Sequence, residues 1–225
     1  MARYATRFDI TEINSTFYRP HQPRTFERWA ASVPARFRFS LKLPRQITHE
    51  ARLLQSGDAL TRFFDDVAGL GKKLGGVLVQ LPPSLAFDAR VADRFFGMVR
   101  RRCDAPVACE PRHASWFEPG VDALWDRYRV ARVAADPARL PAAALPGGAR
   151  GPARWSYWRW HGSPRIYYSR YDDETLQSLA HDLCGQGRPR SPAWCVLDNT
   201  AHGHAIEDAA RLQDLIDGIM AASSP

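Results

Sequence analysis

The feature that most constrains the fold is an alternation of short apolar segments with segments of helical periodicity along the whole chain. Seven segments rich in apolar, aromatic or β-branched residues are predicted as strands: residues 8–13, 37–43, 76–81, 107–110, 130–134, 155–160 and 194–197. Six segments with apolar residues at helical spacing are predicted as helices: residues 24–32, 59–70, 89–102, 120–128, 173–184 and 206–220. Strands that alternate with helices pair in parallel, so the pattern predicts an α/β fold.

Two parallel architectures compete for this pattern. Seven strands are one fewer than the eight that close a (β/α) barrel, and an open doubly wound sheet is the alternative. No Gly-x-Gly-x-x-Gly sequence follows a predicted strand, and polar residues cluster at the C-terminal ends of nearly all the strands. Both observations favour a TIM-barrel-like fold, predicted as one domain over residues 1–225.

The composition fits a soluble globular enzyme or binding domain. The chain has 225 residues, of which 45% are hydrophobic and 24% charged. It contains no apolar run of 18 residues and begins without a secretory signal, so we expect a cytoplasmic protein with no membrane partner. Its four cysteines follow no metal-binding spacing. The net charge of +7 is compatible with a nucleic-acid partner but supports one only weakly.

Polar residues recur in pairs at the ends of the predicted strands. Because side chains alternate along a strand, residues two apart share a face. The pairs are Glu12 with Asn14, Ser40 with Lys42, Glu110 with Arg112, and Arg159 with His161. Gln80, Asp136 and either Asp198 or Asn199 stand at three further strand ends. In a barrel these ends form one mouth, where active sites lie. The alternative is an internal ion-pair network that balances the same charges.

The residue types suggest particular roles at such a mouth. Glu110 and Glu12 are predicted as general acid and base, and His161 as a proton shuttle. Lys42, Arg112 and Arg159 suit a small anionic substrate. Further contacts to a small anionic or sugar-like ligand are predicted for Asn14, Tyr18, Gln80, Trp116 and Asn199. For the aromatic residues Tyr18, Trp116 and Tyr168, stacking on a ligand and packing within the protein are equally compatible with the sequence.

The sequence points to no particular cofactor, and we assign no metal ligands. A single divalent ion held by Glu12, Glu110 and His161 is the alternative arrangement. A metal-dependent phosphodiesterase related to endonuclease-IV-type barrels would need more converging ligands than the strand ends supply.

Several motifs together resemble one protein family. They occupy residues 12–18, 39–49, 80–84, 110–117, 159–162 and 199–205, and include Glu-Pro-Arg-His-Ala-Ser-Trp-Phe at 110–117. In this order they resemble the domain of unknown function 72 (YecE-like) family. The resemblance implies a TIM-barrel-like fold and brings no established activity. Members of that family begin with a strand carrying a Gly-x-x-Gly-Trp-like motif, which this chain lacks. We therefore expect an incomplete barrel of seven strands.

Two classes of function stay open. The first is an enzyme that performs acid–base chemistry on a small anionic or sugar-like substrate at the strand ends. The second is a non-catalytic barrel that binds a ligand or nucleic acid at the same place.

Overall fold

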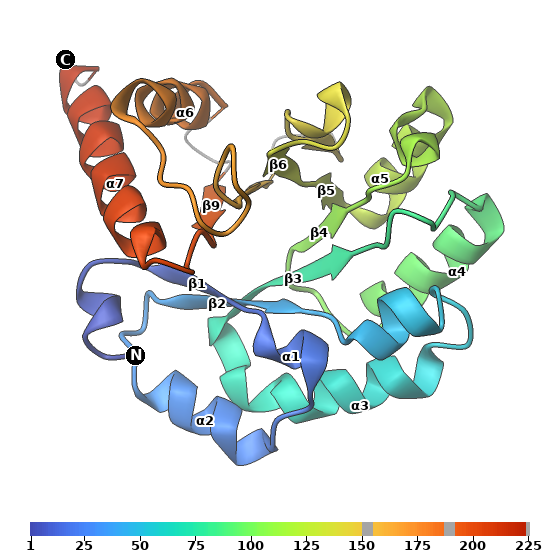
Figure 1. The fold of residues 1–225 in the computed structure, drawn as a ribbon. Coiled ribbons are helices and arrows are strands. Elements are labelled where there is room, and N and C mark those ends of the chain that lie inside the picture. Colours follow the sequence, from blue (N-terminus) through green and yellow to red (C-terminus); the bar gives the residue numbers. More distant parts are fainter. Residues whose placement is uncertain (150–154, 187–191, 224–225) are drawn as a thin grey trace. The chain divides into compact units, whose positions relative to one another are not determined.

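The computed structural model describes residues 1–149, 155–186 and 192–223. It divides into two compact units, Met1–Arg132 and Val133–Pro225, which are considered one after the other. Both units consist of parallel strands connected by helices, as the ribbon in Figure 1 shows. This confirms the predicted α/β class with parallel pairing.

The first unit is built around five strands that pair in parallel in chain order. They are β1 (Ile10–Ile13), β2 (Arg38–Lys42), β3 (Leu74–Gln80), β4 (Val107–Glu110) and β5 (Val130–Arg132). The α-helices are α1 (Ser15–Tyr18), α2 (Pro23–Ala31), α3 (Gly57–Val67), α4 (Ala89–Arg100) and α5 (Asp122–Tyr128). Shorter helical turns cover Tyr4–Thr6, Gln46–Glu50, Ala68–Lys73, Ala114–Phe117 and Pro119–Val121.

The two faces of this sheet carry different chemistry. Phe39 and Leu41 of β2 and Val77 and Val79 of β3 lie in a hydrophobic core, together with residues of the amphipathic helices such as Phe95. Side chains alternate along a strand, so the residues next to these core residues, including Ser40, Lys42 and Gln80, lie on the opposite face. Helices α2, α3 and α4 lie along the apolar side of the strands in Figure 1. The polar face is thus left for a site.

The ends of α4 show how local sequence sets the helix boundaries. The Asp88 carboxylate caps its start by accepting hydrogen bonds from the backbone N–H groups of Arg90 and Val91. At the other end, the Arg100 guanidinium donates to three carbonyl oxygens, including those of Tyr128 and Ala105. Arg100 therefore ties α4 to the following segments.

The second unit contains a smaller parallel sheet with two long helices. Strands β6 (Ala134–Asp136), β8 (Ser156–Trp160) and β9 (Ala193–Leu197) pair in that order. The remaining elements are the turn Pro141–Ala143, the two-residue β7 (Gly147–Gly148), α6 (Asp173–Gln186) and α7 (His204–Ala222). Trp158 of β8 packs with Leu176 and Leu179 of α6 and Leu212 of α7. The β8 side chains that alternate with Trp158, including that of Arg159, point away from this core.

The predicted elements are found with two kinds of difference. The predicted strand at residues 130–134 is two strands, since β5 pairs with β4 and β6 pairs with β8. The short helix α1 and the turn Gln46–Glu50 are absent from the prediction. Closure of a barrel, the single-domain organisation and the missing family strand stay predictions.

Candidate functional site

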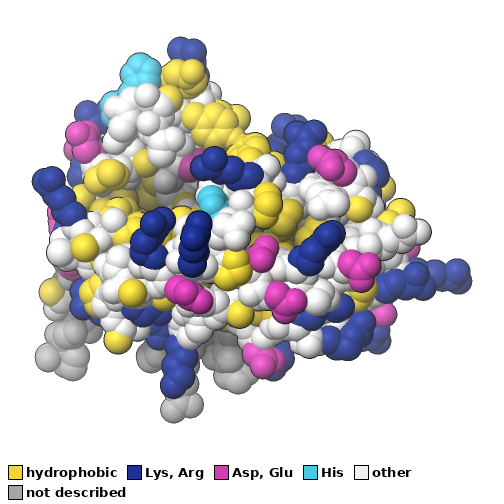
Figure 2. All heavy atoms as spheres, turned by 90° about the horizontal axis from the view of Figure 1, so that it is seen from below, with side chains coloured by type: hydrophobic (Ala, Val, Ile, Leu, Met, Phe, Trp, Pro, Cys, Tyr) yellow, Lys and Arg dark blue, Asp and Glu magenta, His cyan; other side chains and the backbone are white. Residues whose placement is uncertain are grey.

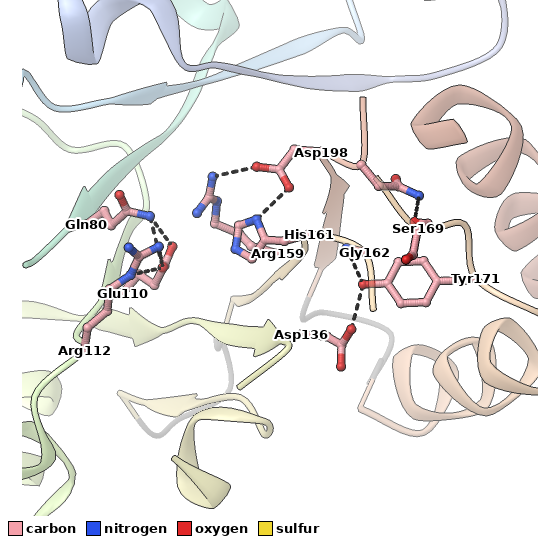
Figure 3. A network of polar contacts seen from close by, with 11 residues as sticks. Gln80, Glu110, Arg112, Asp136, Arg159, His161, Gly162, Ser169, Tyr171 and Asp198 are labelled. Carbon is pink, nitrogen blue, oxygen red and sulfur yellow. Dashed lines mark hydrogen bonds and ion pairs between the residues drawn. The ribbon is translucent and has the colours of Figure 1, made fainter. Parts of the chain in front are cut away.

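The first unit carries a buried polar network at the C-terminal ends of β3 and β4. Gln80 and Glu110 stand opposite each other in the strand register, and Glu110 is only 4% exposed. The Gln80 amide donates to both Glu110 oxygens at 3.0 Å. Arg112 Nε donates to Glu110 Oε1 at 2.8 Å, and Arg112 Nη2 lies 2.7 Å from the same oxygen (Figure 3). Glu110 is therefore held by an arginine and an amide, as the ion-pair alternative describes, and its role as a general acid or base stays a prediction.

A second group of residues lies around the exit of β2. The Lys42 ammonium stands 4.1 Å from the centre of the Phe17 ring, and the His49 ring meets the same phenyl ring edge-on at 5.0 Å. His49 Nδ1 is 2.9 Å from the Thr48 hydroxyl. Burial lowers the pKa of His49 to about 4, and the positive charges of Lys42, Arg112 and Arg45 add to this effect. His49 is thus a neutral imidazole among cations, a role that the sequence did not reveal.

The proximity of Lys42 to His49 gives a direct prediction. We expect the imidazole of His49 to titrate below pH 5 in the folded protein, and the pKa to rise in Lys42→Met, since one repelling cation is removed. Proton NMR of the histidine ring signals across pH 3 to 8 measures both values. Exposed His181 on α6 serves as the internal reference. An unchanged His49 pKa in Lys42→Met would contradict the inferred electrostatic contact.

The second unit holds a histidine–aspartate pair at the ends of β8 and β9. His161 Nδ1 lies 2.6 Å from Asp198 Oδ1, and the Arg159 guanidinium lies 3.6 Å from Asp198 Oδ2 (Figure 3). Arg159 is 2% and His161 6% exposed. The other ring nitrogen, His161 Nε2, is buried and has no hydrogen-bond partner in the described part of the chain. A carboxylate that fixes Nδ1–H leaves Nε2 as a proton acceptor.

The segment after β8 is held by a separate hydrogen-bond network. The Tyr171 hydroxyl donates to Asp136 Oδ2 at 2.6 Å and accepts from the Gly162 N–H at 2.8 Å (Figure 3). Burial raises the pKa of Tyr171, and the bond to Asp136 raises it further, so the phenol stays a donor. Gly162 has φ +91°, and a Cβ there would meet the Ser169 carbonyl oxygen at 2.8 Å. The Asp136 carboxylate therefore holds the loop after β8, while its backbone carbonyl accepts from the His161 N–H at 2.7 Å.

Asn199, predicted as a ligand contact, is bonded within the second unit, and its Oδ1 is buried without a hydrogen-bond partner among the described residues. Its side chain is fully buried and donates to the Ser169 carbonyl and to the Asp208 carboxylate. The neighbouring Asp198, which the sequence left as the alternative at this strand end, is the residue that reaches His161. A shift of one residue moves a side chain to the other face, so Asp198 and Asn199 have different partners, and ligand binding by Asn199 stays a prediction.

The remaining predicted site residues lie in the first unit. Glu12 pairs in register with Ser40, so it shares the polar face, and it is half-buried. Asn14 precedes α1, and its Oδ1 is buried without a hydrogen-bond partner among the described residues. Tyr18 is 75% exposed. Trp116 is 1% exposed, donates to the Leu85 carbonyl and stacks on Trp125, which is core packing.

Each unit therefore brings together a part of the predicted set. The first assembles Gln80, Glu110 and Arg112, with Lys42 on the same sheet face, and the second assembles Arg159 and His161 with Asp198. Convergence of both groups on one mouth stays a prediction.

The described residues contain neither a group of side chains placed to hold a metal ion nor a helix that could span a membrane. Residues 1–149, 155–186 and 192–223 contain no group of three or more His, Cys, Asp or Glu side chains placed to hold a metal ion. No helix in those ranges is long and apolar enough to cross a membrane. On the face drawn in Figure 2, basic and acidic side chains are interspersed.

Comparison with known proteins places the chain in a class and then a family. Its parallel α/β fold matches a DUF72 family protein from Enterococcus faecalis with a TM-score of 0.80, at 20% identity, over 96% of this chain and 92% of that one. A DUF72 family protein from Thermotoga maritima matches with a TM-score of 0.76, at 22% identity, over 93% and 85%. The family model "Protein of unknown function DUF72" matches residues 1–224. The chain belongs to this family.

Two curated relatives match over shorter stretches. The UPF0759 protein YecE of Escherichia coli K12 is 33% identical over 82 residues, which are 36% of this chain and 30% of that protein. The UPF0759 protein YunF of Bacillus subtilis is 30% identical over 127 residues, 52% of this chain and 43% of that protein. The chain thus matches less than half the length of either relative, and neither name states an activity.

Proposed function

We propose that this protein is an enzyme that transfers a proton to and from a small sugar-like or anionic substrate, with His161 as the proton acceptor. The observation that carries the proposal is the buried pair of His161 and Asp198, in which Nδ1 is held and Nε2 has no partner among the described residues. Burying an imidazole nitrogen without a partner is costly unless a ligand uses it. Such departures from full satisfaction are characteristic of functional sites.

The chemistry that this pair supports is general acid–base catalysis. A C–H bond next to a substrate carbonyl breaks, its electron pair stays on the substrate as an enolate, and the proton goes to His161 Nε2. Asp198 stabilises the imidazolium that forms, because its carboxylate is already bonded to Nδ1. The imidazolium then returns a proton to carbon or oxygen. Arg159 holds the second oxygen of Asp198 and so fixes the carboxylate.

The polar group of the first unit supports recognition of negative charge. After burial, the positive charges of Lys42 and Arg112 are among the causes that lower the pKa of His49, so two cations act at this part of the sheet face. This favours an anionic group in a ligand of the first unit. Proton transfer at His161 does not depend on it.

The experiment that tests the function uses solvent deuterium. The full chain is incubated in D2O with hexuronic acids, aldoses, ketoses and sugar phosphates, and proton NMR follows each C–H signal. We expect at least one compound to lose a C–H signal next to its carbonyl, or to form a new product, faster than in buffer. Binding of panel compounds with neither change would identify the non-catalytic alternative and overturn the proposal. The absence of both binding and exchange across the panel would overturn it as well.

A further inference from the structure

A strained tyrosine lies beside the histidine–aspartate pair of the second unit. Tyr167 has φ +70°, a backbone conformation that bulky residues rarely adopt. The conformation is held from both sides, because its N–H donates to the His161 carbonyl and its own carbonyl accepts from the Ala201 N–H at 3.0 Å. Strain of this kind costs free energy and persists where the surroundings impose it, often at a binding site.

The fixed backbone places the Tyr167 ring next to the imidazole. The two ring centres are 6.0 Å apart with an interplanar angle of 78°, and the Tyr167 side chain is 48% exposed although His161 is buried. Tyr167 thus offers an accessible aromatic surface beside the imidazole of His161.

The ring of the next residue, Tyr168, has different neighbours from the ring of Tyr167. The Arg165 guanidinium lies 3.9 Å from the centre of the Tyr168 ring, and the His202 ring lies 5.4 Å from it. The Tyr168 ring is therefore covered by a cation and an imidazole, whereas the Tyr167 ring borders His161 and is 48% exposed. Arg159, the nearest buried cation in sequence, is already bonded to Asp198. The Tyr167 ring therefore supplies an aromatic surface at His161.

We infer that Tyr167 is a specificity-determining residue that receives the apolar C–H face of a cyclic, sugar-like substrate beside His161. This rests on the proposed function and narrows it from small sugar-like or anionic compounds to ring compounds. Aromatic side chains bind such faces because the ring carries negative charge above its plane and the C–H groups are weakly positive. Open-chain compounds with the same charge lack a flat face and would gain little from Tyr167.

The test compares a cyclic with an open-chain sugar acid of equal charge. Glucuronate and gluconate are titrated into the full chain by calorimetry, with Tyr167→Asn, Tyr167→Phe and the loop control Ile166→Asn. We expect the wild-type protein to bind glucuronate more tightly. Tyr167→Asn should lose about five- to tenfold of the glucuronate affinity with little change for gluconate. Tyr167→Phe keeps the ring and should keep the preference.

Thermal unfolding separates recognition from structure. Asn tolerates a positive φ better than Tyr, so Tyr167→Asn should melt at the same temperature as the wild-type protein or higher. Unchanged glucuronate affinity in Tyr167→Asn, equal loss for both acids together with a lower melting temperature, or no preference for glucuronate in the wild type would overturn the inference.

The two proposals fail in different ways. If His161→Gln abolishes deuterium uptake while Tyr167→Asn leaves glucuronate binding intact, ring recognition by Tyr167 is wrong and proton transfer stands. If the Tyr167 effect is present without any deuterium uptake or product, Tyr167 stands as part of a binding site and proton transfer is wrong.

Discussion

Replacing Asp198 by Asn is expected to lower the rate of deuterium uptake about 10²- to 10⁴-fold with little change in KM. Asp198 accepts from His161 Nδ1 and makes no use of Nε2, so its charge acts on the substrate only through the imidazole. An amide at this position no longer stabilises the imidazolium and favours the tautomer with a proton on Nε2. His161→Gln, which keeps the pair of Asp198 and Arg159, should cause a loss of similar size.

The matched control is Asp182→Asn on the exposed side of α6. It removes the same charge from the same unit and should leave both rate and KM unchanged. A melting curve for each variant shows whether the protein is folded at the assay temperature. Folded Asp198→Asn protein with wild-type turnover would exclude Asp198 as the residue that orients His161.

Replacing Arg112 by Leu is expected to lower the free energy of unfolding by about 2–5 kcal/mol. The reason is that Glu110 is 4% exposed and would lose the cation bonded to its Oε1, while its bonds from the Gln80 amide remain. Urea unfolding of both proteins measures the difference. The double variant Glu110→Gln with Arg112→Leu removes the uncompensated charge and should recover most of the loss.

Exposed Arg94 on α4 provides the control for general effects of removing an arginine. Arg94→Leu should change the free energy of unfolding by less than about 0.5 kcal/mol. A cost for Arg112→Leu no larger than this would mean that the network of Gln80, Glu110 and Arg112 does not stabilise the fold. It would favour the predicted catalytic role of Glu110 over the ion-pair alternative.

Part of the site was predictable from the sequence, because side chains along a strand point alternately to its two faces. Lys42, Gln80 and Glu110 each end a strand at the parity opposite to the apolar core, and the sequence shows that parity directly. The choice between Asp198 and Asn199 was not predictable, because the residue that follows Leu197 on the polar face depends on where β9 ends. Asp198 contacts His161, whereas Asn199, one residue later, is buried and bonds the Ser169 carbonyl.

The features that the sequence did not show depend on contacts between residues far apart in the chain. Residues 130–134 are predicted as one strand because four of the five are apolar, yet β5 pairs with β4 and β6 pairs with β8. Tyr167 lies in a loop without periodicity, and its conformation is imposed by the backbones of His161 and Ala201. His49 is neutral because burial, together with the positive charges of Lys42, Arg112 and Arg45, lowers its pKa, and no local sequence pattern shows that burial.

The tautomer of His161 is the property on which the proposed proton transfer depends most directly. It is measured by ¹⁵N NMR of the imidazole at pH 9, where an ordinary imidazole is neutral. We expect the proton on Nδ1, bonded to Asp198, and a bare Nε2 with the ¹⁵N shift of a proton acceptor. A proton on Nε2 in the wild-type protein would contradict the assignment of His161 as the residue that accepts a proton from substrate.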